Sequence, residues 1–207
     1  NEAIEELYEY CVSRYEDFTY HGNALEVDAA LKKAIEFEGN LVAMSDSGDN
    51  ITSGSLGANT FLLKEFLKLE DYQGKRIIFA AIKDEPLFYQ VKNKKMHEIL
   101  DISLGENVDE LSEPIDLKVE IIERGTLQQI FGDTDTFGET ITLSVIDSPI
   151  DIVLIDIPVS FAEMHQYRAA NINLDDYNIV VVKQGYIFPE LSERADYGIM
   201  VLTDGAT

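Results

Sequence analysis

Short apolar runs alternate with amphipathic segments between residues 41 and 95, and this alternation limits the possible folds more than any other feature. Leu41–Ser45 and Lys75–Ile82 are typical of buried strands. Leu56–Leu69 has the spacing of a helix, and a further helix is expected from Pro86 to about Lys95, because proline suits the first helical turn. A strand–helix–strand–helix order predicts parallel strands joined by crossover helices.

The remaining segments extend this pattern and add an antiparallel part. Two strands and then a hairpin are expected in the middle of the chain, over residues 97–104, 115–123, 139–146 and 150–157. The last third returns to alternating helices and strands, over residues 162–169, 177–183, 189–194 and 197–202. The predicted fold class is therefore α/β, with a mixed, partly parallel sheet flanked by helices and an antiparallel hairpin section in the middle.

Two further helices are expected at the start of the chain, over Ala3–Asp17 and Leu25–Phe37. The chain starts at Asn1 directly in a helical pattern, which suggests a piece excised from a longer protein. Its one cysteine, Cys11, excludes an internal disulfide and favours a reducing, cytoplasmic compartment. We expect Cys11 to be a packed thiol, because no base lies beside it in the sequence.

The charge balance excludes several partners. With 16 basic and 39 acidic residues, the formal net charge is −23. So acidic a surface repels nucleic acids and anionic lipids. No apolar run is long enough to cross a membrane. The acidity is interpreted as a means of solubility, with a site for cations or basic ligands as the alternative.

The best candidate site is the loop Asp46–Thr60, which follows a strand and opens a helix. Ligands of open α/β sheets bind outside the carboxyl ends of strands, near helix N-termini. Three glycines allow left-handed backbone or close approach to a ligand, namely Gly48, Gly54 and Gly57. Three side chains offer oxygen atoms, namely Asp46, Asp49 and Asn50. The alternative is a long polar turn with a helix cap, since the phosphate-binding, dinucleotide, EF-hand and nucleophile-elbow motifs are all absent.

A second candidate site begins at Lys183, at the end of the strand expected over residues 177–183. Lys183 can bind a carboxylate or stabilise a developing negative charge, and Tyr186 can donate a hydrogen bond. The alternative is a strand-end lysine that extends into solvent.

Metal ligands are sparse. The histidines His21, His97 and His165 lie far apart, and no H-E-x-x-H motif is present, so each is interpreted as a surface or packing residue. Asp133 and Asp135 share a loop that is read as a solvated turn, with a Mg²⁺ or Ca²⁺ site as the alternative.

The Asp46–Thr60 loop resembles a hallmark of the MlrC (microcystinase C) family, whose C-terminal domain carries a D-x-G-D-N segment before a glycine-rich run and a helix. The positions that fit are Asp46, Gly48, Asp49, Asn50, Gly54, Gly57 and Thr60. The family has proline and further glycines in place of Ile51–Ser53, and often an acidic residue in place of Ala58.

A second, looser match lies near the end of the chain, where the family has an apolar strand that runs into lysine, an aromatic stretch and a T-x-G-x-T-like ending. The corresponding segments are residues 179–183 (IVVVK), Tyr186 with Phe188, and Leu202–Thr207. Many relatives have a histidine where this chain has Ile187, which is a departure from the pattern.

The resemblance implies a C-terminal domain at residues 39–207, preceded at residues 1–38 by the helical end of another domain or a linker. It implies a metal-dependent peptidase or amide hydrolase that acts on a small peptide or amide, with zinc or another divalent metal in the full-length protein and none bound by this chain. The metal ligands are expected in the protein's own N-terminal domain, so this chain contains no catalytic residue and is inactive alone. The loop residues, with Lys183 and Tyr186, then bind substrate or support groups that do.

Two alternatives from other functional classes stay open. The chain is otherwise a non-enzymatic module that binds a small molecule in the glycine-rich loop, or a domain for homo-oligomerisation.

Overall fold

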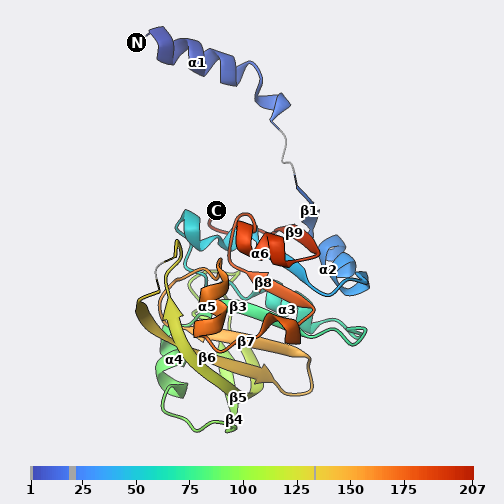
Figure 1. Ribbon diagram of the computed structural model, residues 1–207, viewed down its shortest axis with the longest axis vertical. Helices are drawn as coiled ribbons and strands as arrows, with labels where there is room; N and C mark the ends of the chain where they lie inside the picture. Colours follow the sequence, from blue (N-terminus) through green and yellow to red (C-terminus); the bar gives the residue numbers. More distant parts are fainter. Residues whose placement is uncertain (1, 19–21, 133) are drawn as a thin grey trace.

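The apolar runs form one nine-stranded sheet in the computed structural model, which describes residues 2–18, 22–132 and 134–207. The strand order is β1-β9-β2-β8-β3-β7-β6-β5-β4 (Figure 1). The strands are β1 (Ala24–Glu26), β2 (Val42–Asp46), β3 (Ile77–Lys83), β4 (Ile99–Leu104), β5 (Ile115–Gln128), β6 (Thr136–Val145), β7 (Ile150–Ile155), β8 (Ile179–Val182) and β9 (Tyr197–Leu202).

Helices connect these strands and cover both faces of the sheet. The α-helices are α1 (Glu2–Val12), α2 (Val27–Glu36), α3 (Phe61–Leu67), α4 (Glu85–Val91), α5 (Met164–Ala169) and α6 (Pro189–Arg194). The 3₁₀-helices are η1 (Tyr15–Asp17), η2 (Ser47–Asp49), η3 (Ile51–Ser53) and η4 (Leu174–Asp176). Helices α2, α3 and α4 contribute to the core on one face, and α5, η4 and α6 to the core on the other.

The first half of the sheet is parallel. From β1 to β7 in the strand order, each neighbouring pair runs in the same direction. The central strands β2, β8 and β7 are buried along their whole length, as expected for parallel strands covered by helices on both faces. The predicted parallel strands with crossover helices are therefore confirmed.

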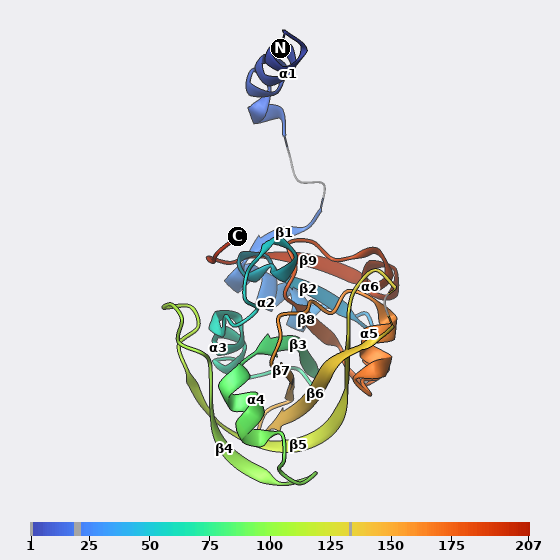
Figure 2. The ribbon, with the colours of Figure 1, turned by 90° about the vertical axis from the view of Figure 1, so that its left-hand side faces the viewer.

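The second half of the sheet is antiparallel. Strands β7 and β6 form the predicted hairpin, and β5 and β4 continue it. These strands curl, and α4 lies in the hollow they form (Figure 2). Side chains alternate between more and less buried positions along the first half of β5, which fits a sheet with one solvated face. The predicted fold class is confirmed in both its parallel and its antiparallel parts.

Several predicted elements differ in their bounds, and three of these differences have a structural cause. The helix expected from Leu56 begins only at Phe61, because the preceding residues are held by a buried carboxylate that is described below. Strand β1 occupies Ala24–Glu26, where a helix was expected to have begun, because this segment pairs with β9. Strand β5 continues to Gln128, past the expected end at Glu123, because it stays paired with β6 as far as Thr136.

The N-terminal residues divide into two parts. Strand β1 and helix α2 belong to the same sheet and core as the rest of the chain, so the boundary between residues 38 and 39 stays a prediction. Helix α1 stands away from the sheet in both views (Figures 1 and 2). The expectation of a packed Cys11 is wrong, because this thiol is exposed on α1. Within the described residues, every helix is too short or too polar to span a bilayer.

Candidate functional site

A buried ion cluster lies where β2 and β8 end. The parallel register pairs Ser45 with Val182, so the next residues, Asp46 and Lys183, are neighbours on one face at the carboxyl edge of the sheet. The Lys183 ammonium nitrogen lies 2.7 Å from Asp46 Oδ2 and 3.1 Å from Asp49 Oδ2, and it donates to the Asn59 carbonyl at 2.7 Å. Lys183 is 2% exposed, so the alternative of a lysine that extends into solvent is wrong.

Asp49 organises the glycine-rich loop around this ammonium group. Its Oδ1 accepts hydrogen bonds from the Ser55 hydroxyl and from the Gly57 N–H, the latter at 2.9 Å. Its Oδ2 accepts from the Asn59 N–H at 2.9 Å. These bonds keep the segment before α3 out of the helix, which explains why α3 begins at Phe61.

Asp46 joins the loop to the C-terminal segment. The Thr203 hydroxyl donates to Asp46 Oδ1 at 2.5 Å and accepts from the Gly48 N–H at 2.9 Å. A Cβ atom at Gly48 would lie 2.5 Å from the carbonyl oxygens of Thr203 and Asp204. The close approach that was expected at Gly48 is thus made to the protein's own C-terminal segment.

The cluster is held together by charge. Burial alone would lower the pKa of Lys183, but the carboxylates of Asp46 and Asp49 outweigh it and raise this pKa above its ordinary value. Burial would raise the pKa of Asp49, but Lys183 together with the hydrogen bonds of Ser55 and Asn59 lowers it below its ordinary value. Lys183 and Asp49 therefore stabilise each other's charged forms.

The other predicted loop residues have structural contacts as well. Asn50 Oδ1 accepts from the Thr52 N–H at 3.0 Å and caps η3. Gly54 and Gly57 take left-handed backbone, with φ of 102° and 69°. The Thr60 hydroxyl donates to the Glu113 carbonyl at 2.8 Å.

Tyr186 lies apart from the cluster. Its side chain is 55% exposed, and its ring stacks on Phe188 with a centroid distance of 5.3 Å. Ile187, at the position of the family histidine, is half-buried and packs against the core on the face covered by α5, η4 and α6.

The remaining candidates are also placed. His97 Nδ1 lies 2.8 Å from Glu120 Oε1, and His165 Nε2 lies 3.0 Å from the Gln129 carbonyl oxygen, so both are surface or packing residues as predicted. His21 and Asp133 lie outside the described residues. Over residues 2–18, 22–132 and 134–207, no three His, Cys, Asp or Glu side chains are grouped to hold a metal ion.

Sequence reasoning missed the exposed tip of the loop. Thr52, Ser53 and Gly54 are exposed, and Leu56 is 46% exposed although it is aliphatic. It also missed Gln166, which is linked to the end of β8 through Ser160. Gln166 Nε2 donates to the Ser160 carbonyl, and the Ser160 hydroxyl donates to the Lys183 carbonyl. A leucine in a loop and a glutamine in a short helix give no local signal of either role.

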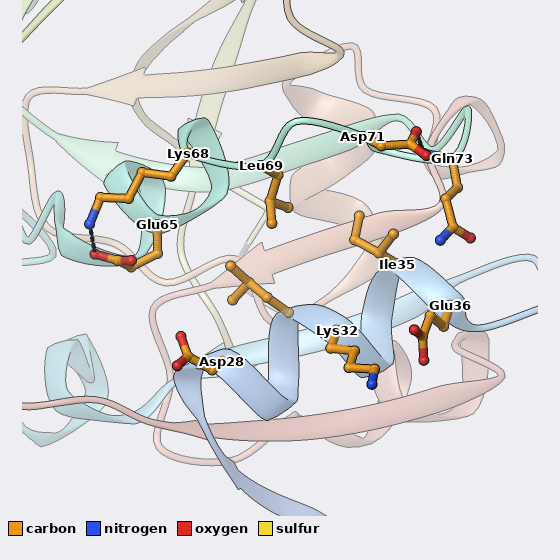
Figure 3. Close-up of a pocket in the computed structure, with 10 residues that line it drawn as sticks. Asp28, Lys32, Ile35, Glu36, Glu65, Lys68, Leu69, Asp71 and Gln73 are labelled. Carbon is orange, nitrogen blue, oxygen red and sulfur yellow. Dashed lines mark hydrogen bonds and ion pairs between the residues drawn. The ribbon is translucent and has the colours of Figure 1, made fainter.

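A groove of about 350 Å³ lies between α2, α3 and the segment after α3 (Figure 3). Leu31, Ile35 and Leu69 contribute its apolar surface. Charged side chains such as Lys32 and Glu65 surround it (Figure 3). It lies beside the helices on one face and shares no residue with the ion cluster. We therefore place the candidate site at the carboxyl edge, where loop, strand ends and C-terminal segment meet.

Comparisons with known proteins identify the family. A solved structure described as "putative metallopeptidase" from Mesorhizobium sp. BNC1 is similar to this chain, with a TM-score of 0.78 and 16% sequence identity. The match covers 97% of this chain and 40% of that chain, so this chain spans well under half of its length. At this identity the likeness concerns the fold. No curated protein sequence matches significantly. The family model described as MlrC C-terminus matches residues 44–207, and the chain therefore belongs to this family.

Proposed function

We propose that this chain is the C-terminal part of a metal-dependent peptidase or amide hydrolase and that its Asp46–Thr60 loop lines the substrate cleft. The observation that carries the proposal is the Lys183 cluster, which fixes the loop at the carboxyl edge of the parallel strands. Open α/β sheets bind their ligands at this edge. Membership of the MlrC C-terminus family and the fold shared with the metallopeptidase structure support the assignment.

The buried and the exposed residues of the loop have different roles in this proposal. Asp46 and Asp49 are bound by Lys183, so they position the loop and have no free carboxylate oxygen pair to offer a metal. The exposed tip, Thr52–Gly54 with Leu56, is the part that can contact a substrate. A preorganised loop loses little conformational freedom on binding, which favours affinity.

The metal, zinc or another divalent ion, would be held by polypeptide outside these 207 residues. Such a metal supplies an activated water for attack on the substrate carbonyl. In this proposal the part of this chain is to bind and orient the substrate.

Metal analysis tests this division of roles. We expect about one divalent metal ion per molecule in the longer protein, together with hydrolysis of short peptide amides. We expect neither metal nor hydrolysis in the 207-residue chain. Elemental analysis after gel filtration, with hydrolysis followed by amine release, measures both. Stoichiometric metal that stays bound to the 207-residue chain would refute the proposal.

A further inference from the structure

Helix α1 has an apolar stripe that nothing covers within the described residues. Its side chains recur at helical spacing, and we call them the α1 stripe: Ile4, Leu7, Tyr8, Cys11 and Val12. The four apolar side chains other than Cys11 are 50–67% exposed, and Cys11 is exposed as well. Figures 1 and 2 show α1 away from the sheet from two directions.

The α1 stripe needs a partner for a physical reason. Helix α1 has 11 residues, and isolated helices shorter than about 12–15 residues are marginal in water. The hydrogen bonds found for residues 2–18 join residues of this segment to one another, so they give it no support from the sheet. An amphipathic helix gains its stability when its apolar face is buried against another surface.

The charges of α1 indicate the kind of partner. Four carboxylates, Glu2, Glu5, Glu6 and Glu9, occupy the helix surface from one edge of the stripe round to its far side. Glu5 and Glu9 flank the stripe, because they lie three residues before Tyr8 and Val12, and helix α1 contains no basic residue. Pairing with a second copy would bring two such sets of carboxylates together, which is unfavourable. An apolar groove with lysine and arginine side chains along its rim satisfies both the stripe and the flanking carboxylates.

We propose that α1 is a docking helix and that its stripe binds such a basic-rimmed apolar groove in the part of the parent protein outside these 207 residues. The proposal rests on the proposed function in assuming that longer protein. It fits the match to the solved structure, which includes nearly all of this chain but less than half of the other.

The single cysteine provides a direct probe, because Cys11 lies within the stripe. We expect the thiol reagent DTNB to modify Cys11 at least about tenfold more slowly in the longer protein than in the 207-residue chain, because burial of the thiol restricts access. The same measurement on Cys11→Ser subtracts the reaction of any other thiols. Equal rates in the two proteins would overturn the proposal. So would a 207-residue chain that sediments as a dimer with a slowly reacting Cys11, because a second copy would then cover the stripe.

A matched pair of variants separates docking from general loss of structure. In the longer protein, Leu7→Asp should speed the reaction of Cys11 about tenfold or more, because a charge in the stripe opposes burial. Tyr10→Asp is the control, because Tyr10 is similarly exposed but lies off the stripe. Equal effects of the two variants would contradict the proposal.

Metal content and hydrolysis, measured on the same samples, distinguish the two hypotheses. Slow Cys11 modification without metal or hydrolysis supports the docking helix and refutes the enzyme.

Discussion

Replacing Lys183 by methionine should lower the free energy of unfolding by about 3–5 kcal/mol at pH 7. The buried carboxylates of Asp46 and Asp49 would lose the ammonium group that lies 2.7 and 3.1 Å from them. Methionine has a comparable length but no charge, so it preserves packing while it leaves two buried charges uncompensated. Urea denaturation at constant pH measures the loss. Lys32→Met is the control, because Lys32 is exposed and its loss should change stability by less than about 0.5 kcal/mol.

The pH dependence of this loss identifies its cause. The pKa of Asp49 is lowered from its ordinary value of 3.8, so its stabilising contribution is present above pH 3.8 and is lost as pH falls through the lower, folded value. The pKa of Lys183 is raised from 10.5, so its contribution is present below pH 10.5 and is lost as pH rises through the higher, folded value. The difference between wild type and Lys183→Met should therefore be largest between these limits and shrink towards acid. A small loss that does not vary with pH would contradict the ion cluster.

Replacing Gln166 by leucine should also cost about 3–5 kcal/mol, because two buried and two partly buried backbone groups lose their partners. Gln166 Oε1 accepts from the N–H groups of Ala162 and Glu163 at 2.8 and 3.0 Å. Its Nε2 donates to the carbonyls of Gln128 and Ser160, both at 2.9 Å. Leucine fills the space but makes none of these bonds.

The comparison for Gln166 is Gln90→Leu, an exposed position on helix α4, where we expect a change within about 0.5 kcal/mol. Thermal and urea unfolding of both variants at pH 7 measure the difference. If Gln166→Leu were no less stable than Gln90→Leu, the hydrogen bonds that support the β8 strand end would have no structural importance.

The sequence predicts most of the fold because its signals are local. Runs such as residues 77–83 and 179–182 are buried on both faces, and Pro189–Arg194 and Tyr197–Leu202 have the bounds that their patterns indicate. Strand β1 could not be predicted, because three residues are too few to show an alternating apolar pattern. Its strand conformation comes from pairing with β9. The exposure of Cys11 was also missed, because an amphipathic pattern reports a face that can be buried and says nothing of its partner.

The candidate site was predicted in its parts but not in its assembly. Asp46 and Lys183 were each placed at a strand end, yet they are 137 residues apart, and only the register of two non-consecutive strands makes them neighbours. Burial of Asp49 was not predictable either, because two of its partners are backbone N–H groups, which every residue carries, and its partner Lys183 lies on a strand that is distant in the sequence. The exposed residues of the loop are the ones proposed to contact the substrate. They were not singled out in the sequence, because the motif is defined by its glycine and aspartate positions.

The central claim is that the exposed tip of the Asp46–Thr60 loop contacts the substrate, and the kinetics of Leu56→Ser in the longer protein test it most directly. The matched control is Ile99→Ser, because both side chains are exposed and aliphatic, while Ile99 lies on the edge strand β4. We predict that Leu56→Ser lowers kcat/KM for peptide amide hydrolysis about tenfold or more, as loss of an apolar contact in a substrate site does, and that Ile99→Ser leaves it unchanged. Equal kcat/KM values for the two variants at equal stability would contradict the claim.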